Sequence, residues 1–328
     1  MKTIRWGIIG CGDVTEVKSG PGFQKAENSR LVAVMRRNGA LAKDYAERHS
    51  VPKWYDNADT LIGDPDVNAI YIATPPDSHK AYTLAAAAAG KPVYVEKPMA
   101  LNYAECEEMV TVCREAGVPL FVAYYRRRLP RFLKVKSLLN GGAIGQVRLV
   151  IAKLYQPPPK KLDADNLPWR LLPEIAGAGL FYDLASHTLD LLDYLLGPIR
   201  LAHGFARNQA HLYPAEDIVC GSFVFESGVQ GVGSWCFSAF ESCDVVDLIG
   251  DKGKLTFSTF SEAPVVLATP DGETEFSIDH PPHVQQPLIQ SIVDELNGQG
   301  TCPSSGESGA RANWVMGQML AGYRSQHG

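Results

Sequence analysis

Short apolar runs alternate with segments of helical character through the first 124 residues, and this alternation restricts the fold more than any other feature. The runs are typical of buried strands because they are short, rich in β-branched residues and bounded by glycine or proline. They cover Ile4–Ile9, Arg30–Met35, Val67–Ala73, Pro92–Val95 and Pro119–Tyr124. Strands that alternate with helices in this way predict a parallel, doubly wound α/β sheet.

The first apolar run leads directly into a glycine-containing turn. Its pattern, Gly10-x-Gly12-x-x-Thr15, approximates the dinucleotide-binding fingerprint. Gly10 permits the tight turn, and Gly12 lets the backbone approach a pyrophosphate at a helix amino terminus. We therefore assign Gly10, Gly12, Asp13 and Val14 to cofactor binding, although Thr15 is bulkier than the small residue usual at the third position.

The second apolar run ends in Arg36 and Arg37, where an acidic residue would bind the ribose 2′-hydroxyl of NAD(H). A carboxylate would repel a 2′-phosphate, whereas guanidinium groups pair with it or stack on the adenine. The two arginines therefore favour NADP(H), with NAD(H) as the alternative cofactor. Two solvated arginines at a strand end are the structural alternative.

Polar residues follow the next two strands at the edge where open parallel sheets bind ligands. Thr74, Pro75 and His79 come after one strand, and Glu96 and Lys97 come after the other. We expect these residues to line the cofactor crevice, with His79 alternatively a helix-start residue. A buried lysine there needs a partner or a chemical role, such as polarising an oxygen or exchanging a proton.

The second half of the chain has a different rhythm, with long segments of strand character separated by turn signals. The segments are residues 146–154, 217–226, 228–240 and 243–249, and the turns include Ser227-Gly228 and Gly250–Gly253. Strands joined by tight turns predict a mostly antiparallel sheet in an α+β domain. One face of such a sheet is often free of helices and could form an oligomer interface.

An acid–base pair precedes most of these strands. Asp183 and His187 are four residues apart, so on a helix they share one face, and Asp190 lies nearby. Histidine is suited to proton transfer near neutral pH, and a carboxylate neighbour can select its tautomer. The alternative is a capped helix start with a satisfied histidine. A metal site is not expected because no third ligand is clustered with the pair.

Composition excludes several functional classes. The formal net charge of −5 argues against a nucleic-acid surface, and no apolar stretch reaches the roughly 18 residues that a bilayer span needs. The first residues enter a strand pattern rather than a signal-peptide pattern. The seven scattered cysteines favour neither disulfides nor zinc. We expect a cytoplasmic protein with neither a nucleic-acid nor a membrane partner.

These motifs together resemble the Gfo/Idh/MocA family of nicotinamide-dependent oxidoreductases. The matching segments are Gly7–Gly12, Ala73–Pro76 with His79, Glu96-Lys97-Pro98, Tyr125-Arg126-Arg127 with Pro130, Trp169-Arg170, Asp183-x-x-x-His187-x-x-Asp190 and Pro303–Glu307. The departures from the family pattern are Thr15, Ala178 and Ala185. None of these departures touches an ionisable catalytic position.

The resemblance implies a Rossmann domain over residues 1–123, followed by an α/β domain over residues 124–328 whose open sheet mediates a homodimer or a homotetramer. The final helix could pack back on the first domain. It also implies that Lys97, Asp183 and His187 converge beside the nicotinamide. His187 would exchange the hydroxyl proton, Lys97 would stabilise developing negative charge on the same oxygen, and Asp183 would position the substrate or support His187.

The implied reaction is reversible hydride transfer between NADP(H) and a carbinol or carbonyl carbon of a sugar, polyol or related compound. Aldoses, inositols, anhydro-ketoses and aromatic dihydrodiols are all compatible substrates. Tyr125, Arg126, Trp169 and Arg170 are the expected substrate contacts, with Trp169 alternatively an interface anchor. The stiff segment over residues 156–161 favours a lid or subunit arm.

Two other functions are compatible with the same scaffold. One is NAD-dependent glycoside hydrolysis, which Arg36 and Arg37 disfavour because a retained NAD would favour an acidic residue there. The other is a cofactor-binding regulator without turnover. The presence of Lys97, Asp183 and His187 disfavours that function, since such regulators tend to lose these residues.

Overall fold

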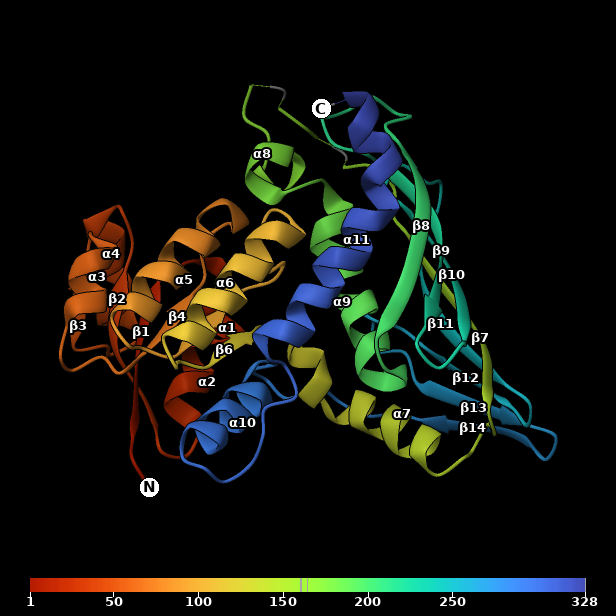
Figure 1. The fold of residues 1–328 in the computed structure, drawn as a ribbon, viewed down its shortest axis with the longest axis horizontal. Coiled ribbons are helices and arrows are strands. Elements are labelled where there is room, and N and C mark those ends of the chain that lie inside the picture. The colour runs from red at the N-terminus through yellow and green to blue at the C-terminus, as the bar shows by residue number, and fades with distance from the viewer. Residues whose placement is uncertain (160, 164, 328) are drawn as a thin grey trace. The chain divides into compact units, whose positions relative to one another are not determined.

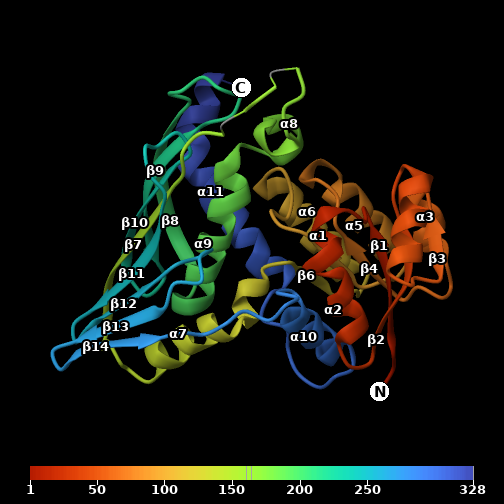
Figure 2. The same ribbon diagram turned by 180° about the vertical axis from the view of Figure 1, so that it is seen from behind.

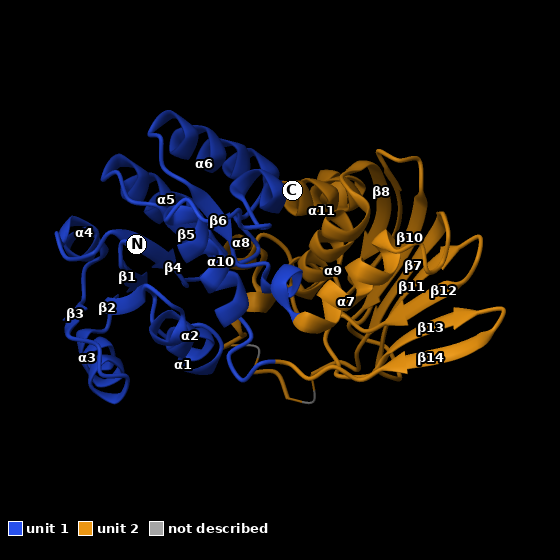
Figure 3. Cartoon of the chain, turned by 90° about the horizontal axis from the view of Figure 1, so that it is seen from below, with its two compact units in different colours: residues 1–129, 281–310 blue, residues 130–280, 311–328 orange. Residues whose placement is uncertain are grey.

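The structure is a computed structural model that describes residues 1–159, 161–163 and 165–327. The described chain divides into two compact units, coloured blue and orange in Figure 3. The first contains residues 1–129 and 281–310, and the second contains residues 130–280 and 311–328. The chain therefore returns to the first unit late in the sequence. The domain boundary after residue 123 stays a prediction.

The first unit is built on a parallel sheet. Its described residues supply six strands in the order β3-β2-β1-β4-β5-β6, which is the order of dinucleotide-binding folds. The strands are β1 (Ile4–Ile9), β2 (Ser29–Met35), β3 (Lys53–Tyr55), β4 (Ala69–Ile72), β5 (Val93–Val95) and β6 (Leu120–Val122). All residues of β4, β5 and β6 are buried, as expected for a sheet covered on both faces. The predicted doubly wound sheet is confirmed.

Helices cover both faces of this sheet (Figures 1 and 3). The helices of the unit are α1 (Asp13–Val17), α2 (Gly20–Lys25), α3 (Gly39–Arg48), α4 (Ala58–Gly63), α5 (His79–Ala88), α6 (Tyr103–Glu115) and α10 (Gln286–Leu296). In Figure 3, α4, α5 and α6 lie over one face, and α1, α2 and α10 lie over the other. Gly22 lets α10 approach α2 closely, because a Cβ there would come within 3.0 Å of Ile289.

The returning segment also completes the edge of the sheet. Phe121 of β6 pairs with Ser305 in an antiparallel bridge, and the Ser304 hydroxyl donates to the Val122 carbonyl at 2.7 Å. The final helix, α11 (Gly306–His327), starts in this unit, where Gly309 lies against Val122. Its residues from 311 onward belong to the second unit.

The second unit is built on a mostly antiparallel sheet. Its described residues supply eight strands in the order β14-β13-β12-β11-β7-β10-β9-β8, and only β7 and β10 pair in parallel. The strands are β7 (Val147–Tyr155), β8 (Ile199–Arg207), β9 (Ile218–Phe225), β10 (Gln230–Cys236), β11 (Cys243–Gly250), β12 (Lys254–Phe257), β13 (Val265–Thr269) and β14 (Gly272–Phe276). This arrangement confirms the predicted fold class.

One face of this sheet packs on helices. These are α7 (Pro130–Asn140), α9 (Leu180–Leu196) and the later part of α11, while the short α8 (Pro173–Ala176) precedes α9. Gly204 and Gly221 allow close packing of α11, because a Cβ at Gly204 would lie 2.8 Å from the Met319 carbonyl oxygen. Figures 1 and 2 show α9 and α11 on the same side of the sheet.

The opposite face carries no helix from the described part of this unit (Figure 2). Its side chains include Leu201, Phe205 and Val232, which are 54%, 75% and 45% exposed. The residues between α7 and α8 include the predicted lid or arm, of which residue 160 lies outside the described residues. Among the described residues, no helix is long and apolar enough to cross a membrane.

Candidate functional site

The turn after β1 has the geometry that its glycines predict. Gly10 has φ +90°, and a Cβ there would lie 2.6 Å from Thr74 Cγ2 and 2.9 Å from the Thr74 amide nitrogen. The amides of Gly10 and Cys11 donate to the Met35 carbonyl at 2.8 and 3.1 Å. Only glycine can therefore occupy position 10 without moving the neighbouring strand end.

The side chain of Thr15 forms hydrogen bonds within this turn. Its hydroxyl donates to the Gly12 carbonyl at 2.8 Å and accepts from the Gly12 amide at 3.0 Å. The side chain is fully buried, and its carbonyl accepts from the Tyr45 hydroxyl at 2.8 Å. The Thr15 hydroxyl therefore adds two hydrogen bonds to the turn, beside the one that the Thr15 amide donates to the Gly12 carbonyl at 2.9 Å.

The space beside the α-carbon of Gly12 is open. A Cβ there would meet only the Gly10 carbonyl oxygen, at 3.9 Å. Gly12 is the N-cap of α1, Asp13 is exposed at the first helical position, and Val14 follows. An uncrowded glycine backbone at the carboxyl edge of a parallel sheet fits a dinucleotide pyrophosphate.

Arg36 and Arg37 are exposed directly after β2, and the Arg36 amide donates to the Tyr55 carbonyl at 3.2 Å. Burial raises the pKa of the Cys11 thiol to about 11, and the Arg36 charge opposes this rise. The positive charge of Arg36 thus acts on the glycine turn. The contact of Arg36 and Arg37 with a 2′-phosphate stays a prediction.

His79 connects two loops of the crevice. Its Nε2 lies 2.8 Å from the Thr74 carbonyl oxygen, and its Nδ1 lies 3.1 Å from that of Pro98 and 3.2 Å from that of Met99. The ring is fully buried, and this burial lowers the pKa of His79. Thr74 and Pro75 are partly exposed in the first of these loops. The contacts of His79 support a role in holding the loops, and its contact with a cofactor stays a prediction.

Glu96 belongs to a buried hydrogen-bond network. Its Oε1 accepts from the Tyr71 hydroxyl at 2.6 Å and from the Gln285 amide at 2.7 Å, and its Oε2 accepts from the Lys97 amide at 3.1 Å. Gln285 Oε1 in turn accepts from the Tyr94 hydroxyl at 2.7 Å. Burial and the Glu96 charge raise the pKa of Tyr71 well above its usual range, so the phenol remains a donor.

This network fixes the position of the Lys97 backbone. Lys97 is partly exposed after β5, and its peptide bond to Pro98 is cis. Sequence reasoning missed Tyr71 and Gln285 as supports of the Glu96-Lys97 element. No local signal could reveal them, because Gln285 is separated from Glu96 by 189 positions in the chain.

In the second unit, helix α9 carries the acid–base residues as the spacing predicts. Asp183 lies in its first turn, and His187 and Asp190 follow on the same side with only 4% and 1% exposure. The His187 ring packs edge-on against Phe260, with the centroids 5.7 Å apart. The spacing argument is thereby confirmed for the helix, while the catalytic roles stay predictions.

Arg170 pairs with Asp183. The Arg170 Nε lies 3.2 Å from Asp183 Oδ2, and the guanidinium carbon lies 4.3 Å from the centre of the Trp169 ring. Arg170 is half exposed, whereas the Asp183 side chain is only 15% exposed. The structure therefore brings three of the predicted residues of this unit together.

Tyr125 and Arg126 lie in the first unit, in the short 3₁₀ helix Tyr125–Arg128, and are 8% and 7% exposed. The Arg126 guanidinium carbon lies 5.0 Å from the centre of the Tyr125 ring. Lys97 belongs to the same unit, whereas Asp183 and His187 belong to the other. Convergence of the three beside a nicotinamide stays a prediction.

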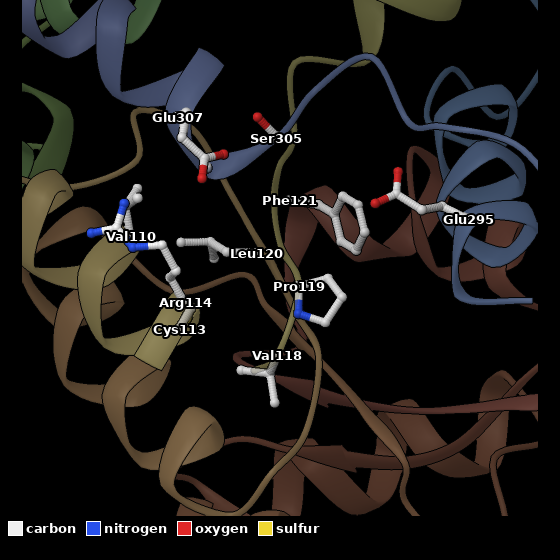
Figure 4. Close-up of a pocket in the computed structure, with 11 residues that line it drawn as sticks. Val110, Cys113, Arg114, Val118, Pro119, Leu120, Phe121, Glu295, Ser305 and Glu307 are labelled. Atoms are coloured by element: carbon white, nitrogen blue, oxygen red, sulfur yellow. The ribbon is translucent and has the colours of Figure 1, made fainter. Parts of the chain in front are cut away.

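A separate cavity of about 220 Å³ lies beside the amino end of β6 (Figure 4). Its lining is Val110, Cys113, Arg114, Val118, Pro119, Leu120, Phe121, Glu295, Ser305, Gly306 and Glu307. None of the residues predicted to bind cofactor or substrate is among them. Ligands of doubly wound sheets bind at the carboxyl ends of the strands, so this cavity is distinct from the predicted site.

Comparisons with known proteins agree with these features. A family model described as an oxidoreductase family with an NAD-binding Rossmann fold matches residues 4–124, and the GFO/IDH/MocA C-terminal domain matches residues 132–256. Oxidoreductase P35 of Formosa agariphila is 41% identical over 317 residues, covering 95% of this chain and 97% of that protein.

Two further proteins are similar over nearly their whole length. The 1,5-anhydro-D-fructose reductase of Ensifer adhaerens is 27% identical over 328 residues, covering 97% of this chain and 94% of that protein. The crystal structure of an aldose-aldose oxidoreductase from Caulobacter crescentus complexed with glycerol matches with a TM-score of 0.88 and 25% identity. That match covers 99% of this chain and 98% of the other.

Proposed function

Because this chain belongs to the Gfo/Idh/MocA family of oxidoreductases, we propose that it catalyses reversible hydride transfer between NADP(H) and a small-molecule substrate. The substrate is a sugar, polyol or related compound that reacts at a carbinol or carbonyl carbon. The observation that carries the proposal is the open Gly12 backbone at the carboxyl edge of the parallel sheet, in a turn that bonds to Met35, the residue before the exposed Arg36. Activities of related reductases on anhydro-sugars and aldoses support the substrate class.

The residues of the glycine turn would hold the dinucleotide. A bound nicotinamide accepts or supplies the hydride. The amides near Gly12 would donate to the pyrophosphate, and Arg36 and Arg37 would pair with a 2′-phosphate. Thr74 and Pro75 would line the crevice, while His79 holds their loop against the loop after Pro98.

Two residues would handle the substrate oxygen. His187 would act as the general acid–base that exchanges the hydroxyl proton, and Lys97 would donate a hydrogen bond that stabilises negative charge on that oxygen. Asp183 would support His187 electrostatically or position the substrate. The ion pair with Arg170 favours a fixed orientation of the Asp183 carboxylate.

Four residues are the proposed substrate contacts. Trp169, stacked on Arg170, presents an aromatic surface that suits the apolar face of a sugar ring. Tyr125 and Arg126 would contribute from the first unit. Arg170 pairs with Asp183, has a side chain that is 49% exposed and would bind a substrate hydroxyl.

A second copy of this chain would cover the helix-free face of the eight-stranded sheet. Leu201, Phe205 and Val232 expose apolar surface there, and exposed apolar patches mark association surfaces. A homodimer or homotetramer is therefore expected. Phe205→Glu should lower the mass measured by light scattering, whereas an unchanged mass would place the interface elsewhere.

Cofactor preference is tested by paired fluorescence titrations with NADPH and NADH. Wild type should bind NADPH more tightly, and Arg36→Ala should lose most of this preference, since one charge-assisted bond contributes about 1.5–3 kcal/mol, or about 10 to 150-fold. Arg30→Ala, an exposed change at the opposite end of the same strand, is the control. Equal or NADH-favouring binding by wild type would refute the 2′-phosphate assignment.

The catalytic roles are tested with a panel of aldoses, inositols, anhydro-ketoses and dihydrodiols. His187→Ala should lower turnover by about 10² to 10⁴-fold and leave the dissociation constant for NADPH nearly unchanged. His211→Asn, a change at an exposed histidine whose φ of +54° asparagine also adopts, should retain activity. Full turnover by the His187 variant would show that another group moves the proton.

A further inference from the structure

The carboxylate of Glu216 is buried at the start of helix α9. Glu216 precedes β9 and is only 2% exposed. Its Oε1 accepts the amide hydrogen of Gly179 at 2.9 Å. Gly179 is the N-cap of α9 and has no side chain with which to cap the helix. Glu216 therefore supplies the cap from a distant part of the chain.

Glu216 and the start of α9 are in close contact. A Cβ on Gly179 would lie 2.7 Å from the Ala215 Cβ, 3.0 Å from the Glu216 carbonyl oxygen and 3.3 Å from its Oε1. The helix has 17 residues, so its amino terminus carries a partial positive charge that favours an anion at this position. The ionised carboxylate therefore bonds more strongly than the neutral acid would.

The same segment supports the residues that hold Asp183. Tyr213 and Ala215 form a buried cluster with Leu171, against which Leu180 packs. Leu171 is the last residue of the short helix Trp169–Leu171, which carries Arg170, and Leu180 is the first residue of α9. Segment 213–216 thus packs on both elements that bring Arg170 to Asp183.

Charged and titratable groups surround the Glu216 carboxylate. From α11, the Arg324 charge lowers the pKa of Glu216, and the pKa of the Tyr323 phenol is raised mainly by its own burial. From its own segment, Asp217 raises the pKa of Glu216, and Tyr213 is a phenol whose pKa burial raises. The Arg324 guanidinium also donates to the Gly177 carbonyl at 2.6 Å, so α11 helps to hold the turn before α9.

We propose that Glu216 is a positioning residue of the active site: its carboxylate holds the Gly179 amide, sets the start of α9 and thereby orients Asp183 toward Arg170. This role rests on the proposed function, in which Asp183 supports His187. Glu216 acts through the helix and touches neither cofactor nor substrate.

The strength of this cap depends on pH. Burial raises the pKa of Glu216 to about 7, so the carboxylate is mostly ionised at pH 8 and mostly protonated at pH 6. Asp217 accepts from the amides of Gln209 and Ala210 at 2.8 and 2.7 Å and holds the preceding loop. Arg324 and the helix terminus stabilise the Glu216 charge. The positioning effect is therefore greatest above pH 7.

The first test compares wild type with Glu216→Gln by the ratio of their kcat values between pH 6 and pH 8. The ratio removes the pH dependence that the two proteins share. It should be near one at pH 6, where both side chains are neutral, and reach about fivefold at pH 8, where only wild type has the charge-assisted bond. Glu226→Gln, an exposed change after the same strand, should give a flat ratio.

The second test does not depend on turnover. The rate of hydrogen exchange of the Gly179 amide in wild type, corrected for its intrinsic pH dependence, should fall from pH 6 to pH 8. The corrected rate in Glu216→Gln should not change over this range. Protection that is independent of pH would overturn the proposal, as would a constant ratio of kcat values. Wild type without turnover on the whole substrate panel would instead overturn the proposed function and the role built on it.

Discussion

Replacing Gly10 by alanine is expected to destabilise the first unit, whereas the same change at Gly12 is not. The new Cβ at position 10 would lie 2.9 Å from the Thr74 amide nitrogen, a backbone atom that cannot rotate away. The residue has φ +90°, where an L side chain costs about 1–2 kcal/mol. Overpacking adds about 1–3 kcal/mol, so the total is about 2–5 kcal/mol.

Gly12→Ala is the matched comparison two residues away. Its φ of −166° is extended backbone, and the new methyl group meets only one atom within 4 Å. The free energy of unfolding should change by no more than about 1 kcal/mol. The methyl group would nevertheless occupy the space through which the pyrophosphate approaches, and NADPH affinity should fall about 10 to 150-fold.

Calorimetric unfolding and NADPH titration separate the two effects. Gly10→Ala should lower the unfolding temperature by at least about 4 °C, and Gly12→Ala should leave it nearly unchanged. Equal destabilisation by both changes would refute the packing argument. Normal NADPH binding by a folded Gly12→Ala protein would refute the placement of the pyrophosphate.

Two further predictions concern stability. Tyr71→Phe removes the buried hydrogen bond to Glu96 and keeps the ring stacked on Tyr94, so we expect a loss of about 1.5–3 kcal/mol in urea unfolding; an unchanged midpoint would contradict this. The Arg48 and His49 bonds lower the pKa of Glu16 to about 2 in the folded protein. This depressed pKa contributes stability above pH 4.5 that is lost as the pH falls toward 2. The stability advantage of wild type over Glu16→Gln should therefore shrink between pH 5 and pH 3, and a constant difference would argue against the ion pairs.

Many strands of the fold could be predicted from local sequence patterns. The runs that became β1, β2, β4, β5 and β6 are short, apolar and flanked by turn residues, so their burial determines their structure. In the second unit, the patterns predicted β7, β9, β10 and β11. The strands β8, β12, β13 and β14 were missed, as was β3, which is only three residues long and partly exposed.

The features of the candidate site likewise fall into those that local sequence patterns predict and those that they do not. Helical spacing placed Asp183 and His187 on one side of α9, because a period of 3.6 residues is a property of the backbone itself. Gly10 and Gly12 were identified from the spacing Gly10-x-Gly12-x-x-Thr15 directly after an apolar strand, which is the pattern of a dinucleotide-binding turn. Local patterns cannot show that Arg170 faces Asp183, since that pairing depends on how the segment before α9 folds.

The sequence by itself determined the two kinds of sheet, the glycine turn after the first strand and the helix that carries the acid–base residues, because each leaves a pattern of residue types within a short stretch of the chain. Only the tertiary structure decided which distant side chains hold those elements in place. Gln285 forms a hydrogen bond with Glu96, 189 positions away in the chain, and Glu216 forms one with Gly179, 37 positions away. Such supports leave no local pattern, since burial and hydrogen-bond geometry are set by the packing of the whole unit.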